Sequence, residues 1–372
     1  MRRCIFHIPN SLEGNYGSHV RPPKMLQGFR DLGYEVDVVM GYGKERKEAI
    51  KKIRKNIQRG IKYDFVYSES STMPTLLTER HHLPTYPFLD FGFLKFCKKN
   101  GIKTGLFYRD IYWKFPEYKE NVRGLRYIFA IFMYRYDLWQ YERILEKFYV
   151  PNKKVAKYVA RPRLEDKMEE LPPGAEPEET FIQDKEAYYA AEDGHEKLKL
   201  FYVGGIGNQY AVEKLFQTVG RLEFVEMTFC CRQPDWEKAK EQYEPWLCDR
   251  IHIVHDSGKD LEKHYRNADI CMAWFKPDLY REMAMPIKLF EYLGKTMPVI
   301  AADRTAAGEF VMENDTGWCI EYSRKALARL LKELHKDYSL IRVKRKSLMI
   351  ALEANQWISR AQKVVDDMQK IC

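Results

Sequence analysis

Short apolar runs alternate with longer amphipathic stretches along the whole chain, a pattern that predicts strands separated by helices. In the first half the expected strands are Cys4–Ile8, Glu35–Met40, Asp64–Ser68, Thr104–Tyr108 and Phe148–Val150. In the second half they are Leu198–Val203, Met227–Cys231, Ile251–Val254, Ile270–Trp274, Pro298–Ala302 and Trp318–Glu321. Strands that alternate with helices favour an α/β fold with doubly wound parallel sheets, and the two series predict two such Rossmann-like halves.

The segment from Glu165 to Lys197 separates the two series. It is rich in Glu, Pro and Asp and poor in β-branched residues, so we interpret it as a connection with little core of its own. We therefore predict a first domain over residues 1–175, a second over 176–345 and a final helical segment over 346–372. That last segment carries apolar residues at helical core spacing: Trp357, Ile358, Ala361, Val364, Val365 and Met368.

Composition places the chain among globular proteins. Its 372 residues are 45% hydrophobic and 14% aromatic, enough for two domains that each bury a core. The formal net charge of +9 would attract nucleic acid, an anionic lipid surface or an acidic substrate, and the sign alone does not choose among them.

Localisation is predicted from what the sequence lacks. No apolar run reaches the roughly 18 residues that a membrane span needs, and the first residues show no secretory signal pattern. Of the eight cysteines, Cys4, Cys230, Cys231 and Cys271 lie inside apolar runs, and no C-x-x-C occurs. We expect reduced thiols and a cytoplasmic protein, which could also act at the inner face of the membrane.

The segment from Arg281 to Leu293 carries the most specific chemistry. Pro286 suits a helix start, where free N–H groups and the positive end of the helix dipole favour a diphosphate. Lys288 and Glu291 are three residues apart and share one helix face. A cation for phosphate and a carboxylate for sugar hydroxyls suit a nucleotide sugar, although the same pair on a helix is commonly just solvated.

Three segments in order resemble one known family. The segment at Pro286 resembles the MP-x-K-L-[FWY]-E-Y motif of GT-B fold glycosyltransferases, in particular the large retaining family that includes many bacterial polysaccharide and lipopolysaccharide transferases. The run from Leu200 to Gly207 resembles the first strand and glycine loop of their donor-binding domain. Leu171-Pro172-Pro173-Gly174-Ala175 resembles the segment that closes their first domain.

The resemblance implies a fold and a donor site. Two Rossmann-like domains would face a cleft, and the C-terminal helix, which begins near Asn355-Gln356-Trp357, would cross back to the first domain. A sugar would move from a nucleoside diphosphate donor to a saccharide or lipid-linked acceptor in cell-surface polysaccharide synthesis, with no metal and no cofactor. Lys288 would meet the charge of the leaving group. The implied donor-binding residues are Gly204, Gly205, Pro286, Ile287, Lys288, Leu289 and Glu291.

The chain departs from the family pattern at two places. The Arg and Lys that usually follow the glycines and clamp the diphosphate are absent, because the loop continues Ile206-Gly207-Asn208-Gln209-Tyr210. After Lys288, Arg232 at the end of a predicted strand is the next candidate cation. The usual Glu-x7-Glu pair is incomplete, since Met283 stands eight residues before Glu291 and Glu282 is one residue off.

Acceptor and catalytic candidates lie in the first half. Gly14, Gly17 and Arg21 belong to the loop after the first strand, where ligands bind in open α/β sheets, although the glycines also suit a plain surface turn. Arg109 and Asp110 follow the fourth strand, where the family commonly places a His-Asp pair. Arg109 cannot act as a base at neutral pH, whereas Asp110 can accept a proton or orient the acceptor; a structural Arg–Asp pair is the other interpretation.

The helical stretch from Val122 to Tyr141 is aromatic and basic. It suits a helix that lies in a membrane interface, which would make the protein a peripheral membrane enzyme, and equally a buried helix with snorkelling arginines. Two other function classes are weaker. A dinucleotide-dependent oxidoreductase would need a last glycine where Tyr210 stands, and a nucleic-acid binder would need basic residues interleaved with stacking aromatics, which the run Lys51–Lys55 lacks.

Overall fold

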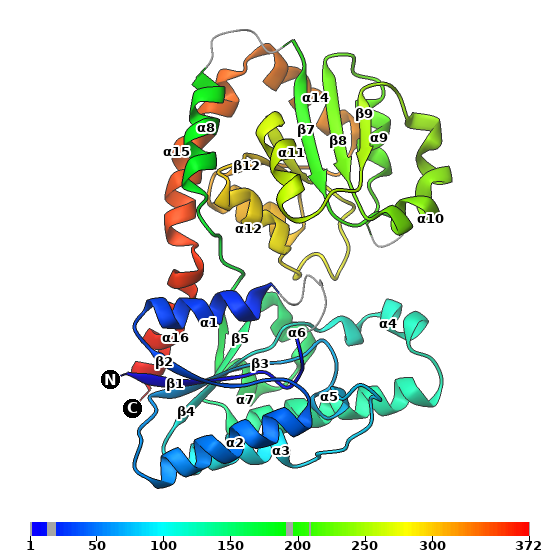
Figure 1. Cartoon of the computed structure of the whole chain (residues 1–372). Helices are drawn as coiled ribbons and strands as arrows, with labels where there is room; N and C mark the ends of the chain where they lie inside the picture. Colours follow the sequence, from blue (N-terminus) through cyan, green and yellow to red (C-terminus); the bar gives the residue numbers. More distant parts are fainter. Residues whose placement is uncertain (1, 13–19, 191–195, 208–209, 372) are drawn as a thin grey trace. The chain divides into compact units, whose positions relative to one another are not determined.

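The computed structural model describes residues 2–12, 20–190, 196–207 and 210–371. The chain forms two compact units (Figure 1). Unit 1 consists of residues 1–174 and 357–372, and unit 2 of residues 175–356. The final helix thus belongs to the same unit as the N-terminal strand, while the helix before it belongs to unit 2.

Unit 1 contains a six-stranded sheet in the order β2-β1-β3-β4-β5-β6, with every neighbouring pair parallel. The strands are β1 (Arg3–His7), β2 (Glu35–Val39), β3 (Phe65–Glu69), β4 (Lys103–Phe107), β5 (Lys147–Val150) and β6 (Met168–Glu170). The strand order reverses between β1 and β3, so loops at the carboxyl ends of these two strands diverge. In open parallel sheets this reversal point is where ligands bind.

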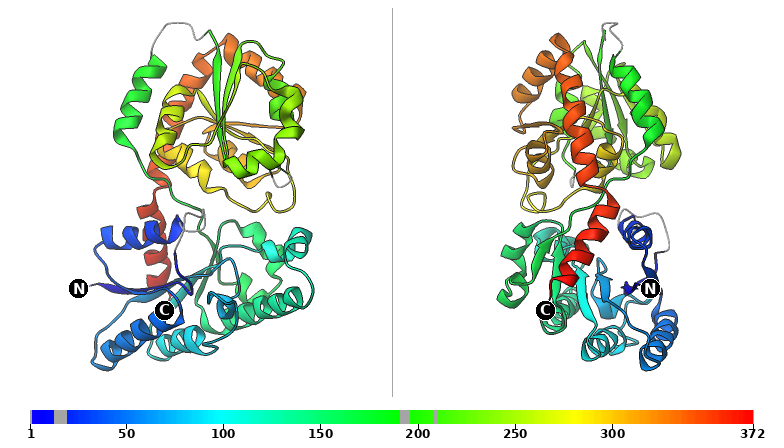
Figure 2. Two further views of the ribbon diagram at one scale, coloured as in Figure 1. Left: turned by 45° about the vertical axis from the view of Figure 1, so that its right-hand side comes forward. Right: turned by 90° about the vertical axis from the view of Figure 1, so that its left-hand side faces the viewer.

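Helices cover both faces of the unit 1 sheet. They are α1 (Arg21–Asp31), α2 (Gly43–Gln58), α3 (Leu89–Lys99), α4 (Pro116–Asn121), α5 (Leu125–Ile144), α6 (Ala156–Val159), α7 (Pro162–Glu165) and α16 (Trp357–Gln369), with single 3-10 turns η2 (Thr75–Leu77), η3 (Tyr112–Lys114) and η4 (Lys153–Val155). The helices α2, α3 and α5 run side by side along one face (Figures 1 and 2). On the other face α16 packs against α1 and β4.

The contact of α16 with α1 depends on small residues. A Cβ added at Gly28 of α1 would lie 3.0 Å from Cβ of Ala361 and 3.2 Å from the carbonyl oxygen of Trp357. The buried side of α16 consists of Trp357, Ala361, Val364, Val365 and Met368, which join the core around β1 and β3. Ile358, which the sequence analysis placed in this core, is exposed instead, because it lies outside the buried stripe of the helix.

Unit 2 contains a second six-stranded parallel sheet, in the order β12-β11-β10-β7-β8-β9. The strands are β7 (Leu198–Val203), β8 (Val225–Cys230), β9 (Ile251–Val254), β10 (Ile270–Ala273), β11 (Val299–Ala302) and β12 (Gly317–Ile320). Numbered within the unit, this is the 3-2-1-4-5-6 order of a dinucleotide-binding fold, and it reverses between β7 and β10.

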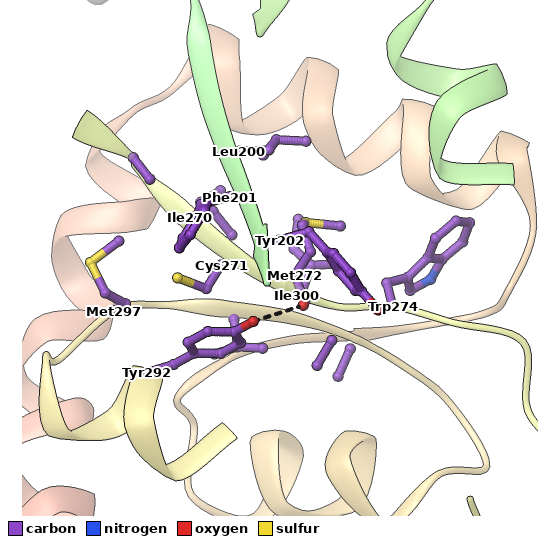
Figure 3. Packing of buried hydrophobic residues seen from close by; sticks show 14 of the residues in the cluster. Leu200, Phe201, Tyr202, Ile270, Cys271, Met272, Trp274, Tyr292, Met297 and Ile300 are labelled. Carbon is purple, nitrogen blue, oxygen red and sulfur yellow. Dashed lines mark hydrogen bonds between the residues drawn. The ribbon is translucent and has the colours of Figure 1, made fainter. Parts of the chain in front are cut away.

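The helices of unit 2 are α8 (Glu179–Ala190), α9 (Glu213–Val219), α10 (Gln233–Tyr243), α11 (Glu262–Asn267), α12 (Ile287–Gly294), α13 (Ala306–Glu313), α14 (Arg324–Lys336) and α15 (Ser339–Ala354), with the 3-10 turns η5 (Glu244–Trp246) and η6 (Gly258–Leu261). Of these helices, α8 precedes the first strand and the others come after strands of the sheet. Their apolar faces enclose one large core around β7 and β10, which includes Phe201, Tyr202, Trp274 and Tyr292 (Figure 3).

The predicted fold class is confirmed, because two six-stranded parallel sheets with flanking helices form the molecule. Every predicted strand is present, with ends shifted by a residue or two. The interpretation of Glu165–Lys197 as a bare connection was wrong. Strand β6 pairs with β5 there, and α8 buries Phe181, Ile182 and Tyr189 in the core of unit 2. A short edge strand with one buried side chain gives no alternating pattern that sequence reasoning can detect.

All seven cysteines of the described ranges carry free thiols. No helix in this part of the chain combines the length and the apolar character that crossing a membrane requires.

The buried Asp137 of α5 provides a test of the packing in unit 1. Its Oδ2 accepts a hydrogen bond from the backbone N–H of Thr75 at 2.7 Å, while its Oδ1 is buried without a partner in the structure. Burial raises the pKa of Asp137 to about 7, against partial compensation by the Thr75 hydrogen bonds. The carboxyl is therefore protonated more readily in the folded chain than in the unfolded one.

In the wild type, ionisation of the buried Asp137 carboxyl should lower the free energy of unfolding as the pH rises. We expect Asp137→Asn to abolish this loss, because asparagine does not ionise. Because the folded pKa is raised, the contribution of this carboxyl is complete below about pH 4 and is lost as the pH rises towards 7. The variant should unfold at nearly the same urea concentration as the wild type at pH 4 and at a higher one at pH 8, with a gain on the order of a few kcal/mol at most. An equal effect at both pH values would contradict this.

Candidate functional site

The carboxyl edge of the unit 2 sheet presents a loop of bare backbone. Gly204 and Gly205 follow β7 at the point where the strand order reverses. A Cβ at Gly204 would lie 2.8 Å from the hydroxyl of Tyr202, and one at Gly205 would overlap the ring of Tyr210. The Tyr202 hydroxyl donates a hydrogen bond to the Gly205 carbonyl at 2.7 Å. A side chain at either position would displace the Tyr202 hydroxyl or the Tyr210 ring, and both glycines remain partly exposed, so the loop presents its backbone at this edge.

Helix α12 is anchored beside this loop by its own buried face. Its N-cap residue Pro286 is extended (φ −73°, ψ 131°), one position earlier than the helical position that the sequence suggested. On the inner side, the Tyr292 hydroxyl lies 3.5 Å from the carbonyl oxygens of Val203 and Met272, at the ends of β7 and β10 (Figure 3). A residue of α12 thus bridges the two strands at the reversal point.

The outer face of α12 presents Lys288 and Glu291. The Lys288 ammonium donates to the Glu291 carboxylate at 2.6 Å, and the two side chains are 39% and 34% exposed. A pair this exposed contributes little to stability, so neither group is needed to hold the helix. The charge of Lys288 also reaches the end of β8, where it opposes the burial that raises the pKa of Cys230 to about 11.

Two predicted donor residues fit less well. The Leu289 side chain is buried in the core, and its backbone N–H donates to the Pro286 carbonyl at 3.2 Å, so this residue supports the helix and has no free group for a ligand. Arg232 precedes α10 with a side chain that is 80% exposed, and it pairs with Asp235 at 2.7 Å. Ile287 is partly exposed at the first turn of α12, as a contacting residue would be.

Arg281 is a cation at this edge to which the sequence analysis gave no role. Its guanidinium lies 5.3 Å from the ring centre of Tyr210 and 5.1 Å from that of Phe275, which follow β7 and β10, respectively. The side chain is 14% exposed and pairs with Asp278. In the sequence, the feature that could have indicated this role is a single arginine in the segment between β10 and α12, which begins at the point where the strand order reverses.

The carboxyl edge of unit 1 is organised by the fully buried carboxylate of Glu69. Arg21 approaches one oxygen at 3.3 Å and Arg109 the other at 2.8 Å, and Tyr67 donates a hydrogen bond at 3.0 Å. Arg21 also donates to the carbonyl of Leu171 at 3.1 Å and lies over the ring of Phe107. Arg21 therefore links Glu69 to the backbone at Leu171, near the end of the first of the two segments that form unit 1.

These contacts correct one acceptor residue and leave others open. With a side chain that is 3% exposed, Arg21 cannot contact an acceptor, because its donors are directed at Glu69, Tyr67 and backbone carbonyls. Gly14 and Gly17 lie outside the described residues.

The Arg109–Asp110 segment follows β4 at the same edge. Arg109 is fixed to Glu69 and to Ser70, whose carbonyl accepts from Nε at 3.3 Å. Burial lowers the pKa of Arg109, and the charge of Glu69 opposes that shift. The Asp110 carboxylate accepts the backbone N–H of Tyr112 at 2.8 Å and remains partly exposed. The structure thus holds Asp110 by its own turn at the carboxyl end of β4.

A buried Ser–His–Asp series occurs near the reversal point of unit 1. His7 contacts the Ser68 hydroxyl at 2.8 Å and Asp90 at 3.0 Å, and Arg46 contacts Asp90 at 3.0 Å. Burial acts to raise the pKa of Asp90, but the hydrogen bonds and charges of His7 and Arg46 lower it overall. Ser68, His7 and Asp90 are at most 2% exposed, so no substrate reaches them and the series is structural.

Comparisons with known proteins agree with this geometry. Residues 197–337, most of unit 2, match the family model described as Glycosyl transferases group 1. A comparison with curated proteins finds no significant match. Among solved structures, HepE from Anabaena in complex with UDP-glucose has a TM-score of 0.61 at 12% identity, over 99% of this chain and 100% of that one.

Two further solved structures are similar over nearly their whole length. A glycosyltransferase from Rickettsia africae has a TM-score of 0.62 at 13% identity, over 100% of both chains. WaaG, a glycosyltransferase involved in lipopolysaccharide biosynthesis, has a TM-score of 0.57 at 13% identity, over 98% of this chain and 100% of that one. The match of residues 197–337 to this family model, together with the two six-stranded parallel sheets, indicates a glycosyltransferase with the GT-B fold.

We expect Glu69→Ala to destabilise unit 1 by about 3–5 kcal/mol, because it leaves two buried guanidinium groups without their shared carboxylate. Glu35→Ala is the matched control, since it breaks the pair with Arg3 at a partly exposed site and should cost less than about 1 kcal/mol. Urea unfolding followed by tryptophan fluorescence measures both. Equal midpoints for the two variants would mean that Glu69 does not organise this edge.

Proposed function

We propose that the chain transfers a sugar from a nucleoside diphosphate sugar to a saccharide or lipid-linked acceptor in the synthesis of a cell-surface polysaccharide. The observation that carries the proposal is the glycine loop of unit 2 beside Lys288, Glu291 and Arg281, at the reversal point of a dinucleotide-type sheet. That HepE forms complexes with UDP and UDP-glucose supports a donor of this class.

Each donor-site residue has a role that follows from its chemistry. The bare backbone at Gly204 and Gly205 lets the diphosphate approach closely. The first turn of α12, which Pro286 begins as the N-cap, offers the N–H groups of Ile287 and Lys288 to it. Lys288 meets the negative charge that develops on the leaving diphosphate. Glu291 accepts hydrogen bonds from hydroxyls of the donor. In the apo chain Lys288 and Glu291 neutralise each other, and a donor would separate them.

Arg281 takes the place of the cations that are missing after the glycines. Its low exposure and its position over Tyr210 and Phe275 hold the guanidinium beside the loop. Arg232 is the weaker candidate, because a side chain that is 80% exposed loses more conformational freedom when it binds.

We assign the acceptor to unit 1 and the proton-accepting or acceptor-orienting role to Asp110. Arg109 stays a guanidinium cation and serves as a charged neighbour of that carboxylate, because Glu69 holds it in place. Retention of the anomeric configuration follows only from the resemblance to the retaining family.

Unit 1 carries features that suit a peripheral membrane contact. Its residues include 36 of the 62 Lys and Arg but only 22 of the 53 Asp and Glu, so it has a net charge of +14 and unit 2 of −5. On α5, Leu125, Ile128 and Phe132 are 84%, 64% and 62% exposed, whereas in the second half of the helix the apolar residues Leu138, Tyr141 and Ile144 are buried. An exposed apolar face on a basic unit suits an anionic lipid surface, where a lipid-linked acceptor would be found.

The oxidoreductase alternative has no support from the comparisons. The family match covers the same glycine loop on which that alternative rested, and Tyr210 closes the loop where a dinucleotide fingerprint needs glycine.

A panel of UDP-, GDP-, dTDP- and ADP-sugars in a thermal-shift assay tests the donor class, because a ligand that binds the native state raises the apparent midpoint. Transfer to saccharide acceptors is then followed with the sugar that binds. A shift with NAD or NADP and with no nucleotide sugar would overturn the proposal.

We expect Glu291→Ala to weaken binding of the nucleotide sugar by on the order of 1.5–3 kcal/mol, one charge-assisted hydrogen bond, without unfolding the chain. Glu237→Ala is the matched control, because Glu237 forms the same i,i+3 pair with Lys240 on the surface of α10. Calorimetry with the donor measures both. Unchanged affinity in the Glu291 variant would remove that residue from the site.

We expect Asp110→Asn to lower the rate of transfer and to leave donor affinity nearly unchanged, because the change removes a carboxylate of unit 1, whereas the proposed donor-binding residues belong to unit 2. Initial rates and donor calorimetry on the same preparation separate the two effects. If donor affinity falls together with turnover, Asp110 belongs to the donor side of the reaction.

We propose that transfer requires no divalent metal, since Lys288 and Arg281 provide the positive charge. Activity should survive dialysis against EDTA and should not rise when Mg²⁺ or Mn²⁺ is added back. Loss of turnover in EDTA with recovery on adding either ion would refute this.

A further inference from the structure

A cavity of about 590 Å³ opens in unit 1, and none of the residues assigned to donor or acceptor lines it. It lies where the helices α2, α3 and α5 run side by side. Its lining includes five cations, namely Arg54, Lys95, Lys98, Lys99 and Arg143. The other lining residues are Gly92, Phe96 and Ile144, so no acidic residue lines this cavity.

Only one of the five cations is neutralised by the protein. The Lys98 ammonium pairs with Glu146 at 3.0 Å and donates to the carbonyls of Arg143 and Ile144, at the end of α5. Within the described ranges the charged groups of Arg54, Lys95, Lys99 and Arg143 form no hydrogen bond or ion pair, and the Nε of Arg54 is buried without a partner.

The two guanidinium groups are held in place by aromatic rings. Arg54 lies 4.9 Å from the ring centre of Phe96, and Arg143 lies 3.7 Å from that of Trp139. Stacking fixes the plane of a guanidinium but leaves its N–H donors free, which prepares it for a planar or tetrahedral anion.

Cations near helix C-termini have an ordinary explanation, since they offset the negative end of the helix dipole. Lys98 fits that explanation, because it binds the last carbonyls of α5. Arg54 does not fit it, since its position is a full turn before the end of α2 and its Nε lacks an acceptor. Four cations without a counter-charge around one cavity repel each other, and an anion would relieve that repulsion.

We propose that this cavity binds a phosphate-bearing anion, either the headgroup of an anionic lipid or a soluble phosphorylated compound. A phosphate offers more acceptor oxygens than a carboxylate and can therefore accept from several of these cations at once, and a phosphate monoester also carries close to two negative charges. The volume exceeds that of one phosphate group, so part of the attached organic group fits as well. The site shares α5 with the exposed apolar face of Leu125, Ile128 and Phe132.

The test compares two charge-matched double variants of the full chain. K95E/K99E reverses two lysines that line the cavity, and K51E/K52E reverses two exposed lysines of α2 that do not. Both changes lower the net charge equally and affect solvated side chains, and circular dichroism melts confirm that the variants fold. The probes are inorganic pyrophosphate, by calorimetry, and vesicles of phosphatidylcholine with or without phosphatidylglycerol, by sedimentation.

We expect K95E/K99E to weaken binding of at least one probe by about tenfold or more, and K51E/K52E to retain it. Loss of binding to phosphatidylglycerol vesicles identifies a lipid headgroup, and loss of pyrophosphate binding alone identifies a soluble compound. Equal losses of binding in both variants would mean that the probes respond to the overall positive charge of unit 1, and this would overturn the site. Binding that neither variant changes would overturn it as well. Lys288→Ala is measured in parallel, because pyrophosphate binding that only this variant abolishes belongs to the donor site of unit 2. The experiment can therefore refute the phosphate site of unit 1 without refuting the donor site of unit 2, and the reverse.

Discussion

The parallel pairing of every strand is the constraint on which the rest of the structure depends. A parallel neighbour requires the chain to cross back over a face of the sheet, so each strand is followed by a helix and all carboxyl ends share one edge. In unit 2 this brings the glycine loop after β7, the Phe275 region after β10 and helix α12 together, although they are far apart in the sequence. The hydroxyl of Tyr292 between β7 and β10 shows how closely α12 follows that edge.

The two units use charge at this edge in opposite ways. In unit 1 the charges are buried and fully engaged, with Glu69 between Arg21 and Arg109, and Asp90 between His7 and Arg46. Such groups are costly to separate and fix the strand ends rigidly. In unit 2 the pair of Lys288 and Glu291 is exposed and worth little, so a ligand can replace each partner at small cost. A rigid edge and an exchangeable pair suit different tasks, orientation of reacting groups and binding of a charged donor.

The uneven distribution of charge adds a property that no single residue shows. Unit 1 is strongly basic and exposes an apolar stretch of α5, while unit 2 is acidic overall. In unit 2 the cations Lys288 and Arg281 are therefore local features of an acidic unit, whereas the net charge of unit 1 attracts anions over a longer range.

The sequence by itself determined the fold class, the strands and the segment around Pro286, because hydrophobic period and short motifs are local properties of the chain. It also placed Lys288 and Glu291 on one helix face, since a spacing of three residues decides that without tertiary contacts. It could not detect β6 or the buried face of α8, whose patterns are too short or too polar. Only the tertiary structure decided which charges are buried with partners from distant parts of the chain and which lie at the edge where a donor is proposed to bind. Arg21 and Arg109 look like candidate ligands in the sequence, and the fold engages both with Glu69; Arg281 looks ordinary, and the fold places it beside the glycine loop. The physical reason is that the availability of a charge depends on burial and on partners far along the chain, which no local pattern records.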